Sequence, residues 1–225
     1  MKFYGTEVHG IMPALIGMRL PMSKNYEDAK GKVDSTIFND TCIIGKQDMR
    51  VAKNLEKADE KKGGGTPNSK FLQMIEIWVC IEAPLTFWSE FDTYRHMVKN
   101  STSKMHKLHS YPIDESCFEV NPFTNKVSES VDIEKLEKLR QKYNETKDKK
   151  DWYELLDNIP SSWLQSRMCH FNYQTLKDMV IWRSEHKLNC WSGKDNPELD
   201  NFIDWVKSLP YAEELIFIGD KNENR

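Results

Sequence analysis

The sequence lacks any long hydrophobic run. No segment approaches the roughly 20 apolar residues that a helix needs to cross a bilayer. The first residues, MKFYGTEVHGIMPALIGMRLP, lack the unbroken apolar stretch and small-residue cleavage site of a secretory signal. The net charge is only -3 for 225 residues, which excludes a strong overall attraction to nucleic acid or to an anionic membrane. These absences predict a soluble cytoplasmic protein without a membrane partner.

Cysteine is sparse and shows no paired pattern. The five cysteines are odd in number and form no CxxC motif, so they predict reduced thiols and no zinc site. His106 and His109 have no carboxylate at a suitable spacing, so surface histidines are favoured over a metal site. Arginine is scarce beside lysine, which makes an arginine at an inward position informative.

What is present suits one domain. The chain is 39% hydrophobic and 11% aromatic, enough to bury a core, and its length predicts a single domain over residues 1–215. Residues 216–225 predict a disordered tail. Residues 48–62 predict a helix that ends at the glycine run 63–65, which lacks phosphate-loop spacing and predicts a flexible loop. Residues 131–158 are highly charged with a narrow apolar edge, which predicts a solvated helical insertion.

The clearest local pattern runs from residue 75 to residue 104. Over residues 75–81 isoleucine and valine alternate with other side chains, which predicts a half-buried strand. Pro84 suits the first turn of a helix. The apolar stripe of residues 85–91 predicts the buried face of that helix, with Arg95 near its end. The polar run KNSTSK, residues 99–104, predicts a loop.

A second informative helix is predicted to begin near Phe171. One of its faces carries, at alternating spacings of four and three, Asn172, Leu176, Met179, Arg183 and His186. The leucine and the methionine mark this face as inward. An inward arginine is costly to desolvate unless it meets an anion or several acceptors. The pattern leaves open both a ligand role for Arg183 and a buried structural salt bridge. A last amphipathic helix is predicted to start after Pro197.

Together, these two segments resemble the flavin-dependent thymidylate synthase (ThyX) family. That family has a strand, an Ala-Pro helix start and the signature RHRxxSxNExSxRY. Aligned without gaps from Ala83, this chain matches the signature at Arg95, Asn100 and Ser103. Downstream, NYQTLKDMVIWR is similar to the family's NxRSLxxFxxLR and keeps Asn172, Leu176 and Arg183, with Pro160 twelve positions before Asn172 as in the family. The resemblance spans about residues 67–190, strong in layout and weak in identity.

The resemblance implies a mixed α/β (α+β) fold with a central, mostly antiparallel sheet flanked by helices, and a homotetramer that binds FAD where subunits meet. It implies that Arg95 and Asn172 contact FAD, with Asn68 at the position of an upstream histidine near the flavin. It also implies a catalytic role for Arg183, which would hydrogen-bond the pyrimidine of a dUMP-like nucleotide. NADPH and methylenetetrahydrofolate would be co-substrates. The implied substrate-binding positions are Glu90, Asn100, Ser101, Ser103 and Lys104.

Three phosphate-binding arginines of the family are replaced here, by Thr93, Met105 and Leu156. At roughly 1.5–3 kcal/mol for each charge-assisted contact, their loss predicts much weaker phosphate binding. Two hypotheses stay open. One is a divergent flavoprotein that methylates a pyrimidine nucleotide at C5 or modifies it in a related way. The other is a catalytically inactive relative, such as a virus would encode, that binds a nucleotide or another protein. Nucleic-acid binding by basic residues 95–109 is disfavoured by the low net charge and the lack of interleaved aromatics.

Overall fold

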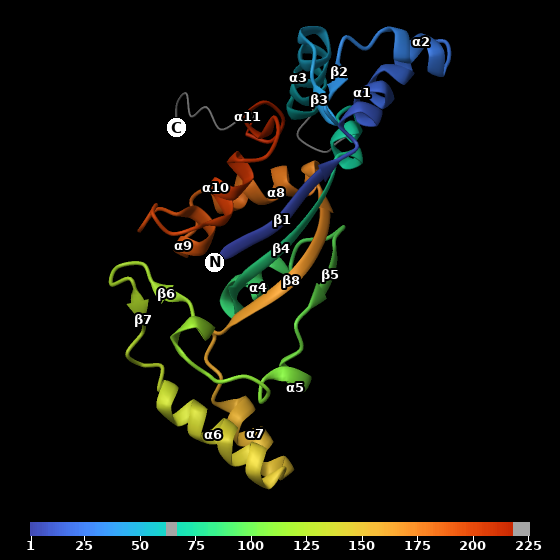
Figure 1. The fold of residues 1–225 in the computed structure, drawn as a ribbon. Coiled ribbons are helices and arrows are strands. Elements are labelled where there is room, and N and C mark those ends of the chain that lie inside the picture. The colour runs from blue at the N-terminus through green and yellow to red at the C-terminus, as the bar shows by residue number, and fades with distance from the viewer. Residues whose placement is uncertain (62–66, 218–225) are drawn as a thin grey trace.

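The protein is seen here as a computed structural model, which describes residues 1–61 and 67–217. A four-stranded antiparallel sheet lies in the middle of the molecule, with helices beside it and beyond both of its ends (Figure 1). In spatial order its strands are β1 (Lys2–His9), β4 (Glu76–Pro84), β8 (Leu164–Asn172) and β5 (Val98–Ser101). The fold is therefore the antiparallel sheet flanked by helices that the sequence leads us to expect.

The central strand β4 confirms the alternation predicted over residues 75–81. Its isoleucine and valine side chains are fully buried on one face of the sheet. On the other face Trp78 is 37% exposed, and His170 of β8 stacks on it with 4.3 Å between ring centroids. Because a shift by one residue would bring the apolar set to the solvated face, this burial fixes the register of β4 between β1 and β8.

The sequence predicts neither β5 nor β8, and the structure corrects it at both places. The first half of the polar run 99–104 is strand, not loop, because Asn100 pairs with Met168 at the edge of the sheet. The helix predicted to begin near Phe171 is preceded by the whole of β8 and begins at Tyr173.

Helices following β4 and β8 bury the inner face of the sheet. They are α4 (Leu85–Phe91), α8 (Tyr173–Arg183), α9 (Asn189–Ser192), α10 (Phe202–Lys207) and α11 (Ala212–Leu215). Trp88, Trp191 and Phe202 are almost fully buried among them, in one core with the inner residues of β4. Helix α4 is shorter than predicted, so Arg95 lies in the loop that follows it. The helix expected after Pro197 begins only at residue 202.

One end of the molecule is formed by the segment between β1 and β4. Its elements are α1 (Ile11–Arg19), α2 (Tyr26–Gly31), β2 (Thr36–Phe38), β3 (Thr41–Ile43) and α3 (Lys46–Glu60). The fully buried carboxylate of Asp48 joins them, because it accepts hydrogen bonds from Arg19 and from the backbone of Asp34 and Ser35. Helix α3 confirms the helix predicted over 48–62. The predicted glycine loop, 63–65, lies outside the described residues.

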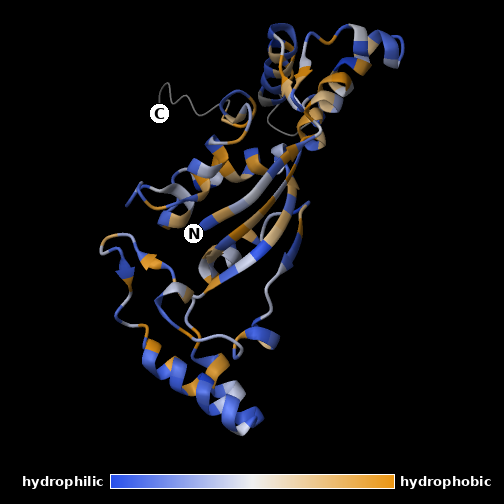
Figure 2. Ribbon diagram, viewed as in Figure 1, coloured by the Kyte–Doolittle hydropathy of each residue, from blue (hydrophilic) through white to orange (hydrophobic). Residues whose placement is uncertain are grey.

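The opposite end contains the charged segment. Its elements are α5 (Lys104–Lys107), β6 (Val120–Asn121), β7 (Lys126–Val127), α6 (Ile133–Thr146) and α7 (Lys149–Asp157). Figure 2 shows α6 and α7 as mainly hydrophilic ribbons with separate hydrophobic positions. Leu136, Trp152 and Leu155 are among the buried residues of these helices, which form a second small core. The helices are divided at Lys147, whose φ is 53°. That residues 131–158 are an insertion stays a prediction.

The extent of the domain also stays a prediction. Of the predicted tail, 216–225, the structure describes Ile216, which is buried, and Phe217, which packs on the main core. The remaining tail residues are outside the described part. Within residues 1–61 and 67–217 no helix has the length and apolar character to span a bilayer, and no cluster of acidic, histidine and cysteine side chains is placed to hold a metal ion. The five cysteines are free thiols.

Candidate functional site

Two of the predicted site residues line one pocket. A hollow of about 400 Å³ lies between the loop after α4, the 3-10 helix η2 (Lys70–Met74) before β4 and the first half of α8. Arg95 comes from the loop and Asn172 from the start of α8, so segments far apart in the sequence converge there. We call this hollow the Arg95 pocket; its other walls include Tyr94, His96 and Asp178.

Arg95 has the features of a ligand-binding side chain. It is exposed, and it makes no hydrogen bond or ion pair with any residue that the structure describes. The next residue, His96, has a φ of 62°, a left-handed conformation that is uncommon outside glycine. Such strain concentrates at functional sites. A guanidinium presents a planar fork of donors that matches phosphate oxygens, so this wall of the pocket can accept an anion.

The start of α8 supplies the facing wall. Asn172 caps the helix, because its side-chain oxygen accepts from the Thr175 amide at 3.0 Å and from the Thr175 hydroxyl at 3.2 Å. The positive end of the helix dipole therefore lies at the pocket. Asp178 is the acidic group on this wall, and burial raises its pKa above the usual value. A carboxyl group that protonates more easily opposes an anionic ligand less.

Arg183 lies beside the pocket but is already engaged. Its Nη1 is 2.8 Å from the Glu90 carboxylate, and its Nε donates to the Tyr94 hydroxyl at 2.8 Å. The guanidinium also lies 4.9 Å from the centre of the Trp191 ring, and the arginine side chain is only 12% exposed. Arg183 thus forms an ion pair, but the pair is not the fully buried salt bridge considered above, because the Glu90 side chain is 43% exposed. Since Tyr94 also lines the Arg95 pocket, the two arginines are separated by one side chain.

The other predicted site residues lie outside the Arg95 pocket. Asn68 donates to Asp59 at 2.6 Å, next to the end of α3. Asn100 and Ser101 lie on the exposed edge strand β5. Ser103 caps the short helix α5, which begins at Lys104. The structure therefore brings together Arg95 and Asn172, places Arg183 and Glu90 next to them, and leaves these five residues elsewhere on this chain.

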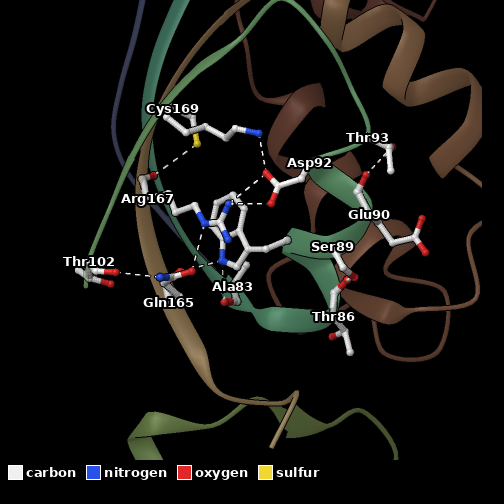
Figure 3. Close-up of polar contacts among 12 residues, drawn as sticks. Ala83, Thr86, Ser89, Glu90, Asp92, Thr93, Thr102, Gln165, Arg167 and Cys169 are labelled. Atoms are coloured by element: carbon white, nitrogen blue, oxygen red, sulfur yellow. Dashed lines mark hydrogen bonds and ion pairs between the residues drawn. The ribbon is translucent and has the colours of Figure 1, made fainter. Parts of the chain in front are cut away.

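An ion-pair network next to the site is not foreseen in the sequence. Arg167 of β8 donates from Nη1 to both carboxylate oxygens of Asp92 at 3.0 Å, and Lys99 of β5 pairs with the same carboxylate. Burial opposes ionisation of Asp92, but hydrogen bonds from Lys99 and Arg167 outweigh it and lower the pKa. Figure 3 shows Arg167 reaching from β8 toward Asp92 at the end of α4. The network fixes the start of the loop that carries Arg95.

The inward position of Arg167 could in principle have been predicted from the sequence. It alternates with Cys169 and Phe171, both buried, so its position in the sequence places it on the inner face of the sheet. There its guanidinium lies 4.3 Å from the centre of the Trp88 ring. The signal is hidden because β8 itself is not predicted.

Comparisons with known proteins support the fold. No family model and no curated protein sequence matches this chain. The flavin-dependent thymidylate synthase ThyX of Helicobacter pylori, in complex with FAD and dUMP, superposes with a TM-score of 0.61 at 16% identity, over 96% of this chain and 98% of that one. A second structure of the enzyme with FAD and dUMP gives 0.60 at 16% identity, over 96% and 97%.

A related result comes from a different enzyme. The UMP/dUMP methylase PolB of Streptomyces cacaoi, bound to 5-Br dUMP, superposes with a TM-score of 0.56 at 12% identity, over 96% of this chain and 95% of that one. At such low identities the similarity concerns the fold alone. The chain therefore has a ThyX-like fold over nearly its whole length.

Proposed function

We propose that this chain binds FAD and a pyrimidine nucleotide of the dUMP type, and that it methylates the base at C5 or modifies it in a related way. The observation that carries the proposal is the Arg95 pocket, where a guanidinium that has no partner among the described residues faces the capped start of α8. The ThyX-like fold adds support, since the neighbours of this fold were crystallised with FAD and dUMP.

The residues of the pocket fit the phosphate-bearing part of FAD. Arg95 would bind the pyrophosphate, and Asn172 would position the ligand at the helix start, with Thr175 beside it. A volume of about 400 Å³ lies toward the lower end of the range for ligand pockets, roughly 300–1,000 Å³. This supports completion of the site by neighbouring subunits, and we propose a homotetramer. Asn68, Asn100, Ser101, Ser103 and Lys104 would then act in a site shared between copies.

Arg183 would hold the base. A donor that points at a pyrimidine carbonyl stabilises the negative charge that develops when C5 becomes nucleophilic. Packing against Trp191 and the hydrogen bond to Tyr94 restrict the arginine to one orientation, which such a donor requires. Bound flavin supplies the hydride chemistry that protein side chains lack. NADPH and methylenetetrahydrofolate are the co-substrates that the proposal requires.

FAD titration tests the binding half of the proposal. Purified protein should quench flavin fluorescence saturably, and Arg95→Met should weaken binding roughly 10- to 150-fold, the equivalent of about 1.5–3 kcal/mol for one charge-assisted contact. Arg50→Met is the matched control. Arg50 is an exposed arginine on α3, outside the pocket, so this substitution removes the same charge without touching the pocket. Absence of flavin binding, or equal binding by both variants, would refute the role of Arg95.

A non-catalytic nucleotide-binding protein is the second candidate. It is favoured by Thr93, Met105 and Leu156, which stand where the resemblance places phosphate-binding arginines. Release of tritium from C5-labelled dUMP, in the presence of FAD, NADPH and methylenetetrahydrofolate, separates the two candidates. Turnover supports the enzyme, and nucleotide binding without any release supports the binding protein.

A further inference from the structure

The wall of the Arg95 pocket that α8 supplies ends in a hydrogen-bond acceptor. Asn172 and Asp178 both line the pocket, and the six-residue step from the cap to the aspartate corresponds to about 9 Å along the helix axis. Oδ1 of Asp178 accepts a hydrogen bond from Nε2 of Gln174 at 3.0 Å. Oδ2 has no hydrogen bond or ion pair with any residue that the structure describes, so it can accept from a ligand.

Gln174 holds this carboxylate in place and is itself incompletely bonded. It lines the same pocket, with only 9% of its surface exposed. Its Oε1 is buried and has no hydrogen-bond partner among the described residues. Because a buried acceptor without a partner costs free energy, a ligand that donates a hydrogen bond is favoured at this wall.

The pocket therefore has two ends of opposite character. Arg95, which has no described partner, and the N-terminus of α8 attract an anion at one end. Asp178 supplies negative charge at the other. Lys177, the neighbouring cation, pairs with Glu56 of α3 at 2.5 Å, and its charge affects the pKa of Asp178 less than burial does. An anion is favoured at Arg95, and a hydrogen-bond donor is favoured at Asp178.

The size of the pocket links its two ends. A water molecule occupies roughly 30 Å³ in the liquid, so a hollow of about 400 Å³ holds on the order of a dozen non-hydrogen atoms. A phosphate bound to Arg95 leaves room for one attached group of about the size of a pentose. That group must then lie against the wall that carries Asp178.

We infer that Asp178 is a specificity-determining residue, which makes the Arg95 pocket select a sugar phosphate over a phosphate that carries no hydroxyl groups. The phosphate binds Arg95, and a hydroxyl of the attached sugar donates to the free oxygen of Asp178. An anion without such a donor gains nothing from the carboxylate and is repelled by it. This inference rests on the proposed function and names the part of the ligand that lies in the pocket. The phosphate-bearing sugars of FAD and of a nucleotide share this chemistry.

Ribose 5-phosphate and propyl phosphate test this selection, because they carry the same phosphate ester with and without hydroxyl groups on the attached chain. Their dissociation constants follow from the shift of the thermal unfolding midpoint with ligand concentration at pH 8. The wild type should bind ribose 5-phosphate at least fivefold more tightly than propyl phosphate. In Asp178→Asn, Gln174 still bonds Oδ1 and the free oxygen becomes an amide donor, so the ratio should fall below two. Propyl phosphate should then bind at least twofold more tightly, because the negative charge is gone.

Asp157→Asn is the matched control. Asp157 is an exposed aspartate at the end of α7 that forms no ion pair with the described residues, and its substitution should leave the ratio unchanged. A wild-type ratio below two, or the same ratio in the wild type and in Asp178→Asn, would overturn the inference.

The FAD titration keeps this result separate from the proposed function. If Asp178→Asn abolishes the sugar preference while neither FAD nor dUMP binds, the role of Asp178 stands and the proposed function fails. If FAD binds through Arg95 but the wild type shows no sugar preference, the proposed function stands and the role of Asp178 fails. Where FAD binds, FMN, ADP and dUMP distinguish the sources of the sugar phosphate. Asp178→Asn should weaken at least fivefold the one whose sugar lies in the pocket, and no effect on any of the three would overturn the inference.

Discussion

Replacing Glu137 by glutamine should destabilise the end of the molecule built from α6 and α7. The carboxylate accepts from Arg140 at 2.7 Å, from Gln141 at 2.8 Å and from the backbone amide of Ile113 at 2.9 Å. It thereby ties α6 to the chain that precedes β6. The hydrogen bond from Arg140 is the main reason that the pKa of Glu137 falls from 4.5 to about 2.

The expected magnitude follows from this pKa. The shift corresponds to roughly 3 kcal/mol at most. The side chain keeps 23% of its surface exposed, and solvent screening reduces the contribution to about 1–2 kcal/mol. Because the pKa is lowered in the folded state, this stabilisation is fully present above pH 4.5 and is lost as the pH falls toward 2.

Urea unfolding between pH 7 and pH 3, with hydrogen exchange of the α6 amides, measures the effect. Glu137→Gln should lose stability and protection at pH 7, and its difference from the wild type should shrink toward pH 3. Glu134→Gln serves as control, since its pair with Lys138 is largely exposed, and no measurable change is expected. A Glu137→Gln protein as stable as the control at pH 7, or a difference that does not depend on pH, would refute the reasoning.

Three further outcomes are expected. Gly10→Ala should lower the thermal unfolding midpoint more than Gly5→Ala. Both glycines have positive φ, but a Cβ at residue 10 would also clash with the Met74 carbonyl, whereas the space around residue 5 is open. Equal decreases in the two midpoints would contradict this. Trp88→Phe should cost about 1–3 kcal/mol of unfolding free energy, since its buried indole N–H donates to two carbonyls. Burial lowers the pKa of His186, so its protonation should destabilise the wild type as the pH falls below 6.5, and His186→Asn should flatten that part of the pH–stability curve.

The part of the fold that could be predicted is the part in which apolar residues recur with one consistent spacing. In β4 every second side chain is buried. Pro84 ends this strand and is the N-cap of α4, one position before the first helical turn in which the sequence predicts it, so the pattern from residue 75 to 91 matches the structure closely. In β8 the inner positions begin with Gln165 and Arg167, and these polar residues hide the alternation that Cys169 continues. Tertiary partners, among them the Trp88 ring, make those inner positions acceptable, and a local pattern cannot reveal them.

Strand β5 was missed for a different reason. Asn100 and Ser101 favour turns over strands, and nothing in the local sequence opposes a loop. Their strand conformation comes from pairing with β8, a partner that is distant in the chain. Register with a neighbouring strand here outweighs intrinsic preference.

The candidate site was predictable only in part. The spacing of the two resembling segments suggested that Arg95, Asn172 and Arg183 converge on one cleft. Arg95 and Asn172 do line one pocket, whereas Arg183 lies beside it and bonds Tyr94 of its wall. The partner of Arg183 could not be identified, because Glu90 reaches it across the interface between α4 and the end of α8. A contact between two helices that are far apart in the chain cannot be predicted from the hydrophobic periodicity of either helix.

The two rims of the sheet have a consequence for how copies of the chain can meet. Strand β1 carries a bulge between Tyr4 and Glu7, with Gly5 at a φ of 57°, and β5 is four residues long and includes Lys99. Bulges, short edges and lysine all hinder the addition of a strand from another molecule. Copies should therefore associate through side-chain surfaces, without a sheet that continues from one chain to the next, and the concentrated protein should resist edge-to-edge aggregation.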